Sequence, residues 1–294
     1  MKIILFVFAV LSSTISSCQS AEWLATSGGQ LSIQTSSHSM FPHPERMNGH
    51  SYGDTLFSFE ASYNDSSVAI FVPDHFKSGE SVDLVFYFHG WGNKIQESFD
   101  KFDLLNQFSA SKKNAIFVFP EGPKDASDSF GGKLEEKDVF KSLVGDVLAF
   151  LKNQKIIKRA IPGQIILAGH SGAYRVISFI LNRGGLSENI SEVYLFDALY
   201  GGMERFGYWL DKYDGRLVNI TTPNGGTWIN SQRFLNDLAD WGTPFQTYTT
   251  NELTPDDLRA EKVVTIFTDL KHSEVINPYF ELFLKSSRLS SIPD

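Results

Sequence analysis

The alternation of short apolar runs with segments of helical periodicity is the feature of this sequence that most constrains its fold. Runs such as Val82–Phe88 and Val263–Phe267 are almost continuously apolar, which is typical of strands buried on both faces of a parallel sheet. Between such runs, segments such as Val139–Asn153 repeat apolar side chains at helical spacing. We therefore expect an α/β fold, a mainly parallel central sheet flanked by helices on both faces. The other predicted strands are 68–72, 115–119, 164–168, 193–196 and 217–220, with an earlier one within 56–63, and the other predicted helices are 96–108, 172–183, 231–240 and 278–286.

A strand, a tight turn and a helix follow one another around Ser171. The apolar run 165–168 leads directly into the segment 169–173, which reads Gly-His-Ser-Gly-Ala, and a helical pattern follows. Small residues at 169 and 173 let the strand and helix backbones approach closely, as the sharp turn beneath a nucleophilic serine requires. The helix N-terminus would add positive potential where an oxyanion forms. This context predicts Ser171 as a nucleophile; the alternative is a solvated serine in an ordinary turn.

A second glycine-containing segment, 89–92 with the sequence His-Gly-Trp-Gly, directly follows the strand run Val82–Phe88. Such a flexible backbone can turn an amide N–H towards a substrate carbonyl. The predicted oxyanion hole therefore consists of the N–H groups of Trp91 and Gly172, the residue after the nucleophile. We expect a structural role for His89. The alternative for the whole segment is a glycine-rich turn.

His272 is the only one of the seven histidines that lies C-terminal to Ser171. It follows the last predicted strand, which is where the general base lies when the chain order is serine, acid, histidine. A histidine there would take the proton from Ser171 and return it to the leaving group. The alternative is a histidine in a surface loop.

Asp197 is the best candidate for the acid that orients this histidine. It ends the run 193–196, so its carboxylate is expected at the carboxyl edge of the sheet, on the side where sites form. The loop after the run 217–220 carries no carboxylate, which favours Asp197. Asp269 and Glu274 are weaker alternatives close to His272, and Asp214 lies at the wrong end of its strand.

Together these segments resemble the α/β-hydrolase family over about residues 66 to 290, with Ala173 where the strict pattern has glycine. The resemblance implies hydrolysis through an acyl-enzyme on Ser171 without a cofactor, and the substrate would be a small-molecule or carbohydrate ester. An amidase or peptidase with the same triad and a non-catalytic binding protein remain open. Trp91 and Tyr200 lie beside the predicted site loops and are candidate substrate-binding residues, with core or rim packing as the alternative.

The first 20 residues have the pattern of a signal peptide. Lys2 precedes an unbroken apolar run over 3–11, which is too short to span a bilayer. Cys18, the only cysteine, follows Ile-Ser-Ser in a pattern that resembles a bacterial lipobox, which implies lipidation at Cys18 and a stable membrane anchor. The alternative is free secretion after cleavage. We expect an exported protein, in the cell envelope or secreted, that contacts a membrane only through this anchor.

The remainder divides into two parts. Residues 21–55 are rich in Ser, Gly and His with weak periodicity, which predicts an N-terminal extension or tether. Residues 56–294 are expected to form one catalytic domain without a large lid.

Composition narrows the function classes. Hydrophobic residues make up 42% of the 294 residues and charged residues 20%, which is typical of a folded domain. The net charge of −8 and the lack of a Lys/Arg run argue against nucleic-acid binding. No Cys/His cluster or glycine-rich phosphate loop occurs in the sequence, so neither a metal nor a cofactor is expected.

Overall fold

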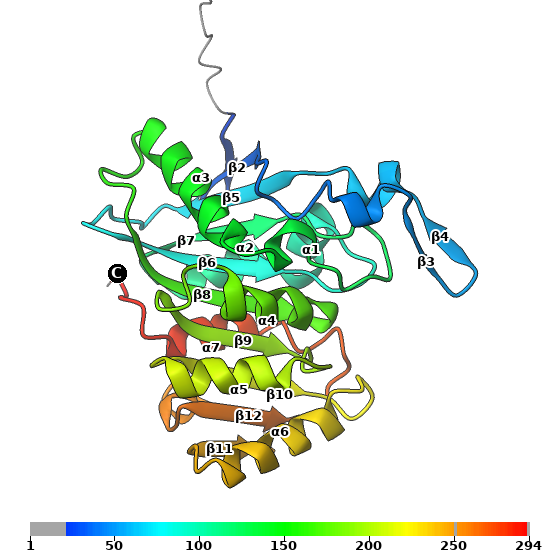
Figure 1. Ribbon diagram of the computed structural model, residues 1–294. Helices are drawn as coiled ribbons and strands as arrows, with labels where there is room; N and C mark the ends of the chain where they lie inside the picture. Colours follow the sequence, from blue (N-terminus) through cyan, green and yellow to red (C-terminus); the bar gives the residue numbers. More distant parts are fainter. Residues whose placement is uncertain (1–21, 250–251, 293–294) are drawn as a thin grey trace, which may run out of the picture.

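A ten-stranded sheet runs through the whole computed structural model, which describes residues 22–249 and 252–292 (Figure 1). Its strand order is β1-β2-β5-β7-β6-β8-β9-β10-β12-β11. The pairs from β7 through β11 are parallel, whereas β1, β2 and β5 add antiparallel pairs at one edge. The expected α/β architecture with a mainly parallel sheet is therefore confirmed. The strands are β1 (Leu24–Thr26), β2 (Gly29–Thr35), β5 (Ser67–Pro73), β6 (Val82–Phe88), β7 (Ala115–Pro120), β8 (Pro162–His170), β9 (Ile190–Phe196), β10 (Arg216–Thr221), β11 (Phe245–Tyr248) and β12 (Val263–Phe267).

Helices cover both faces of the sheet, and this explains the continuous apolar runs. In β6, Phe86 and Phe88 pack into one hydrophobic core, whereas Val85 and Tyr87 pack into the other. Side chains of a strand alternate between the faces of a sheet, so a strand covered on both sides needs apolar residues at every position. The first core contains side chains of α3 (Val139–Asn153), α4 (Tyr174–Arg183), α5 (Met203–Lys212) and α6 (Trp228–Asp240), and the second contains side chains of α1 (Ile95–Phe102), α2 (Leu104–Ala110) and α7 (Tyr279–Ser286).

The N-terminal part of the described chain differs from the expected tether. Strand β2 pairs antiparallel with β5 over its whole length, and β1 pairs with β2, so this stretch belongs to the sheet. A separate short hairpin, β3 (His50–Tyr52) and β4 (Thr55–Phe57), projects from the body at the right of Figure 1. Strand β2 has no apolar run because it lies next to the edge of the sheet, where Gln30, Ile33 and Thr35 are exposed and only Leu31 is a buried apolar side chain. This made it resemble a polar linker.

Other boundaries also differ from the sequence-based expectation. The helix expected over 96–108 is two helices, because Asp103 adopts a left-handed conformation between α1 and α2. The strand expected within 56–63 is the short β4 followed by a π-helical turn, Phe59–Tyr63. No helix in the described ranges is both long and apolar enough to cross a membrane. The predicted signal peptide and Cys18 lie outside the described residues.

Candidate active site

The predicted site residues gather at the carboxyl edge of the parallel strands. Ser171 follows β8, Asp197 follows β9 and His272 lies in the loop after β12. Strands β8, β9, β10 and β12 are consecutive neighbours and all parallel, so their carboxyl ends share one edge of the sheet. The loop 89–92, which carries Trp91, follows the carboxyl end of β6 on the other side of β8.

Ser171 occupies a strained turn between β8 and α4. Its φ angle is 55°, a left-handed conformation that is uncommon for a residue with a side chain. The backbones are so close here that a Cβ atom on Gly169 would lie 2.6 Å from Ile177 and 2.7 Å from Ala173. A glycine at 169 and a small residue at 173 are therefore what allows the strand to reverse into the helix beneath Ser171.

The loop that carries Trp91 is shaped by His89. Nδ1–H of His89 donates to the carbonyl of Gly90 at 2.7 Å, which fixes the orientation of the peptide between Gly90 and Trp91. In a planar trans peptide the N–H points opposite to the C=O, so the amide of Trp91 is directed away from His89. Gly90 lies against the nucleophile turn, since a Cβ added to it would be 2.6 Å from Cβ of Ser171.

Two amides are thus available near Ser171. The N–H of Trp91 donates to no protein acceptor within the described ranges. Gly172 lies in the first turn of the short helix Ser171–Ala173, where backbone N–H groups have no acceptor inside the helix. This arrangement fits the two-donor oxyanion hole predicted from the sequence.

Asp197 and His272 form a direct hydrogen bond. Nδ1 of His272 lies 2.6 Å from Oδ2 of Asp197, whose side chain is completely buried while that of His272 is 35% exposed. Thr222 donates its backbone N–H at 3.1 Å and its hydroxyl at 2.6 Å to the same carboxylate, and Thr227 donates its hydroxyl. Of the weaker acid candidates, Asp214 pairs with Arg288 and Glu274 pairs with Lys271, whereas the hydrogen-bond partner of Nδ1 of His272 is Asp197.

These contacts define the charge state of the pair. Burial by itself raises the pKa of the Asp197 carboxyl, but hydrogen bonds from His272, Thr222 and Thr227 outweigh it and hold that pKa below its ordinary value. An ionised Asp197 keeps the proton of a neutral His272 on Nδ1. The other ring nitrogen, Nε2, is then free to accept a proton, which is what a general base requires.

His170, the residue before the nucleophile, connects β8 to the loop that carries His272. Its Nε2–H donates to the backbone carbonyl of His272 at 2.9 Å, and the two rings lie 4.5 Å apart. Burial, together with the nearby His272, lowers the pKa of His170 to about 3, so this ring is neutral at ordinary pH. The sequence placed His170 in the nucleophile motif but gave no signal that it contacts the base.

Tyr200 lies beside the nucleophile. Its hydroxyl donates to the carbonyl of Gly225, and its ring lies 6.4 Å from that of His272. Burial and the negative charge of Asp197 raise the pKa of Tyr200 to about 12, while a hydrogen bond with Ser171 acts in the opposite direction. This position is compatible with the substrate contact predicted for Tyr200.

Trp91 combines a backbone and a side-chain contribution. Its indole N–H donates to Oγ of Ser129 at 2.7 Å, and a Cβ on Gly172 would lie 2.8 Å from the indole ring. The side chain nevertheless remains 40% exposed. The indole therefore borders the nucleophile turn and also faces solvent, as a residue at the rim of a binding site would.

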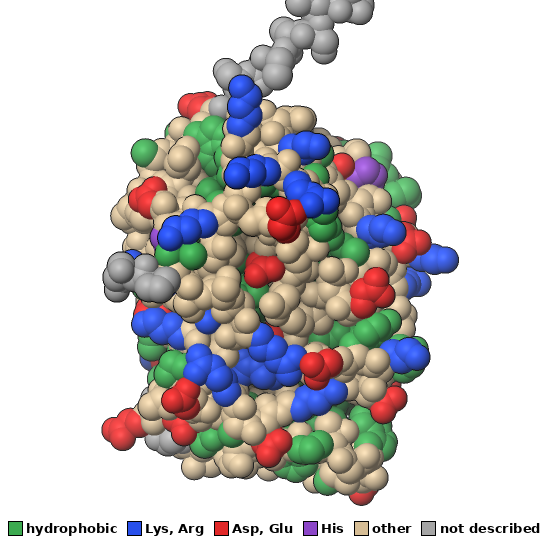
Figure 2. All heavy atoms as spheres, turned by 90° about the vertical axis from the view of Figure 1, so that its left-hand side faces the viewer, with side chains coloured by type: hydrophobic (Ala, Val, Ile, Leu, Met, Phe, Trp, Pro, Cys, Tyr) green, Lys and Arg blue, Asp and Glu red, His purple; other side chains and the backbone are tan. Residues whose placement is uncertain are grey.

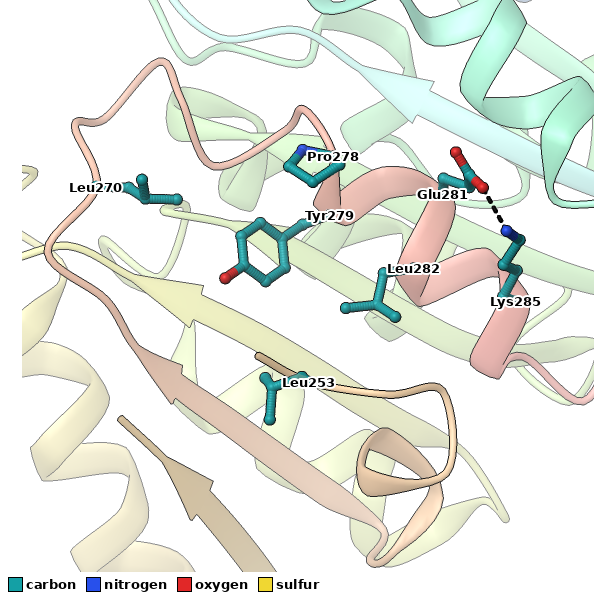
Figure 3. A pocket seen from close by; sticks show the side chains of 7 residues that line it. All are labelled: Leu253, Leu270, Pro278, Tyr279, Glu281, Leu282 and Lys285. Atoms are coloured by element: carbon teal, nitrogen blue, oxygen red, sulfur yellow. Dashed lines mark ion pairs between the residues drawn. The ribbon is translucent and has the colours of Figure 1, made fainter. Parts of the chain in front are cut away.

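A mainly apolar cavity of about 440 Å³ lies between α7, the loop after β12 and the segment before β12 (Figure 3). Leu270 and Pro278 line it from this loop, and Leu253 lines it from the strand-connecting segment before β12. Neither Ser171 nor His272 lines this cavity. It is therefore separate from the candidate site, although it borders the segment that holds the base. Among the described residues, no group of three or more His, Cys, Asp or Glu side chains could hold a metal ion.

Comparisons with known proteins identify the fold. No family model matches the sequence, and no curated protein matches it. A serine-to-alanine mutant of the feruloyl esterase module from Clostridium thermocellum, complexed with sinapinate, is similar with a TM-score of 0.54 at 10% identity over 89% of each chain. A ferulic acid esterase gives 0.51 at 13% identity, over 74% of this chain and 91% of the other. The fold is that of the α/β-hydrolases.

Proposed function

We propose that this protein is a serine hydrolase that cleaves carboxylic esters through an acyl-enzyme on Ser171. The observation that supports this most directly is the hydrogen bond between His272 and the buried Asp197, at the sheet edge where Ser171 occupies its strained turn. The similar structures include a feruloyl esterase and a ferulic acid esterase, which agrees with ester cleavage.

The proposed reaction has two balanced halves. Oγ of Ser171 attacks the ester carbonyl carbon while Nε2 of His272 takes the hydroxyl proton. The N–H groups of Trp91 and Gly172 stabilise the oxyanion. The C–O bond to the alcohol then breaks, the alcohol takes the proton from His272, and the acyl group stays on Ser171. A water molecule repeats the attack with the same base, which releases the carboxylic acid and free Ser171.

Replacement of the nucleophile tests the proposal. Ser171→Ala is expected to abolish hydrolysis of p-nitrophenyl acetate and labelling by a fluorophosphonate probe, with an unchanged circular dichroism spectrum and melting temperature. Ser290→Ala, which removes an exposed hydroxyl at the opposite end of the sheet, is the matched control. Full activity in the Ser171→Ala variant would overturn the mechanism, and a higher kcat/KM for an anilide than for the matching ester would assign an amidase instead.

We also propose that the protein is exported and anchored through lipid on Cys18. The sequence supports this with Lys2, the apolar run over 3–11 and the lipobox-like residues before the cysteine. In a bacterial host, the full chain is expected in the membrane fraction and to incorporate labelled palmitate, whereas Cys18→Ser lacks the label. A soluble, unlabelled mature protein from the unaltered chain would favour free secretion.

A further inference from the structure

Large apolar side chains are exposed to water beside the candidate site. Tyr52 is 55% exposed and Trp91 is 40% exposed, and their ring centroids lie 4.9 Å apart at an interplanar angle of 68°. Tyr52 belongs to the hairpin of β3 and β4, which also exposes Leu56. A scattered exposed apolar residue needs no explanation, but an aromatic pair next to a nucleophile is typical of a binding surface.

Contacts with residues 128–130 hold both Trp91 and the segment that precedes the hairpin. The indole of Trp91 is bonded to Ser129. Asp128, the preceding residue, accepts a hydrogen bond from Nε of Arg46 at 2.7 Å in an ion pair whose side chains are 15% and 6% exposed. The Arg46 guanidinium also lies 4.5 Å from the centroid of Phe130. The segment that leads into the hairpin is therefore tied to residues 128–130, which also bond the indole, so Trp91 is preorganised before a ligand arrives.

We propose that Tyr52 and Trp91 form a subsite for a sugar ring on the alcohol side of the ester, an inference that rests on the proposed hydrolase function. The indole of Trp91 borders Gly172 and thus the position of the reacting carbonyl, and the ring of Tyr52 packs against this indole. Exposed polar residues flank Tyr52 on the hairpin, namely Ser51, Asp54 and Thr55. Aromatic rings can cover the C–H face of a sugar while polar neighbours bind its hydroxyl groups.

An apolar acyl chain fits this surface less well. Burying such a chain requires an enclosed apolar cavity, and Ser171 does not line the apolar cavity of Figure 3. Tyr52 of the hairpin and Trp91 of the loop 89–92 instead lie on an exposed surface. An extended, hydroxyl-rich alcohol such as an oligosaccharide matches that shape.

The test compares two esters that share the acetyl group. For Tyr52→Ala, the ratio of kcat/KM for an O-acetylated xylo-oligosaccharide to kcat/KM for p-nitrophenyl acetate is expected to fall about five-fold, mainly through KM, as the loss of one aromatic contact predicts. Tyr52→Phe keeps the ring and should keep the ratio. Tyr208→Ala removes a tyrosine that is 54% exposed on α5 and is the matched control.

Two results would overturn the proposal. One is an unchanged ratio in Tyr52→Ala. The other concerns kcat/KM for methyl ferulate relative to methyl acetate: if Tyr52→Ala lowers this ratio more than the ratio for the sugar ester, the rings bind the acyl group. If the unaltered protein hydrolyses none of these esters, the proposed function itself fails. Calorimetric titration with the unacylated oligosaccharide then decides the subsite alone: binding weakened about five-fold by Tyr52→Ala supports it, and equal binding or no binding overturns it.

Discussion

Strand β9 carries a buried carboxylate near each end, and the two have different partners. Glu192 near the amino end and Asp197 just after the carboxyl end both have fully buried side chains. About 17 Å of extended chain separates them. Glu192 accepts two bonds from the guanidinium of Arg216, whose side chain is itself only 4% exposed, and one from the hydroxyl of Tyr194 at 2.7 Å. Asp197 has the titratable, partly exposed His272 instead.

The two carboxylates therefore have different roles: Glu192 contributes to stability, and Asp197 contributes to the chemistry of the site. Arg216 cannot give up its proton, and its guanidinium also bonds the carbonyl of Leu258 and the hydroxyl of Ser286. The pair with Glu192 is therefore static and ties β9, β10 and the end of α7 together. His272 has one nitrogen fixed by Asp197 and one available, so the same kind of carboxylate supports proton transfer at the other end.

The surroundings of the two ends differ as well. Figure 2 views the side of the molecule where the parallel strands begin, and Lys and Arg side chains gather across its lower half with acidic side chains between them. Arg216, Arg259, Lys262 and Arg288 line a cavity of about 350 Å³ there, together with Asp214 and Glu261. The three arginines form ion pairs with Glu192, Asp256 and Asp214, and Lys262 donates to backbone carbonyls, which suits a structural network.

The largest expected effect is on catalysis at the carboxyl end. Asp197→Asn should lower kcat for p-nitrophenyl acetate by about 10,000-fold, because the amide no longer holds the imidazole in the tautomer that accepts a proton on Nε2. Steady-state kinetics measures this, with Asp214→Asn at the exposed amino end of β10 as the control. A loss below ten-fold in the folded variant would remove Asp197 from the proposed triad.

The next effect is on stability at the amino end. Arg216→Met should lower the free energy of unfolding by about 3–5 kcal/mol, because it leaves the buried charge of Glu192 without its partner. Urea denaturation followed by circular dichroism measures this loss, and kcat of the folded protein should not change. The double variant Arg216→Met with Glu192→Met should recover most of the loss. A large kcat decrease in the single variant would contradict the separation of the two ends.

The contrast also explains what the sequence could predict. Asp197 could be predicted because it directly follows an apolar run, and such a run marks the end of a buried strand in the sequence. The pairing of Glu192 with Arg216 depends on the register between β9 and β10, in which these two residues are direct partners. The register between two strands depends on how both of them pack in the folded sheet. The sequence therefore did not predict this pair.

Strands with a solvent-exposed face were the main omission. β11 has only four residues, none fully buried, and pairs with β12 alone, so its sequence resembles a loop. β2 was missed for a similar reason. In the site, the nucleophile, base, acid and oxyanion segments were each predicted from their place after a strand, whereas the roles of His170 and Tyr52 depend on contacts between distant segments.

A smaller effect is expected when one bond of the amino-end network is removed. The hydroxyl of Tyr194 lies 2.7 Å from Oε2 of Glu192 and 3.0 Å from the carbonyl of Phe283. Tyr194→Phe removes this donor but keeps the ring, so the free energy of unfolding should fall by about 1–2 kcal/mol with kcat unchanged. Tyr208→Phe, at an exposed tyrosine, should change neither quantity. A change in the pH dependence of kcat in Tyr194→Phe would link the two ends.

The smallest effect concerns the free energy of unfolding at acidic pH. The pKa of Asp197 is depressed in the folded protein by its bonds to His272, Thr222 and Thr227, which outweigh the effect of burial. An unfolded aspartate titrates near pH 3.9, so this carboxylate contributes stability that is fully present above that pH and is lost as the pH falls through the lower folded value.

Asp197→Asn removes this titration. Between about pH 5 and pH 2, the unfolding free energy of the unaltered protein should therefore decrease more steeply than that of the variant, by at most about 1.4 kcal/mol per pH unit. Urea denaturation at several pH values in this range measures both slopes. Parallel curves would show that Asp197 titrates alike in the folded and unfolded states. Its hydrogen bonds would then hold the carboxylate in position without favouring its charge, and the argument that Asp197 keeps the proton of His272 on Nδ1 would lose its electrostatic basis.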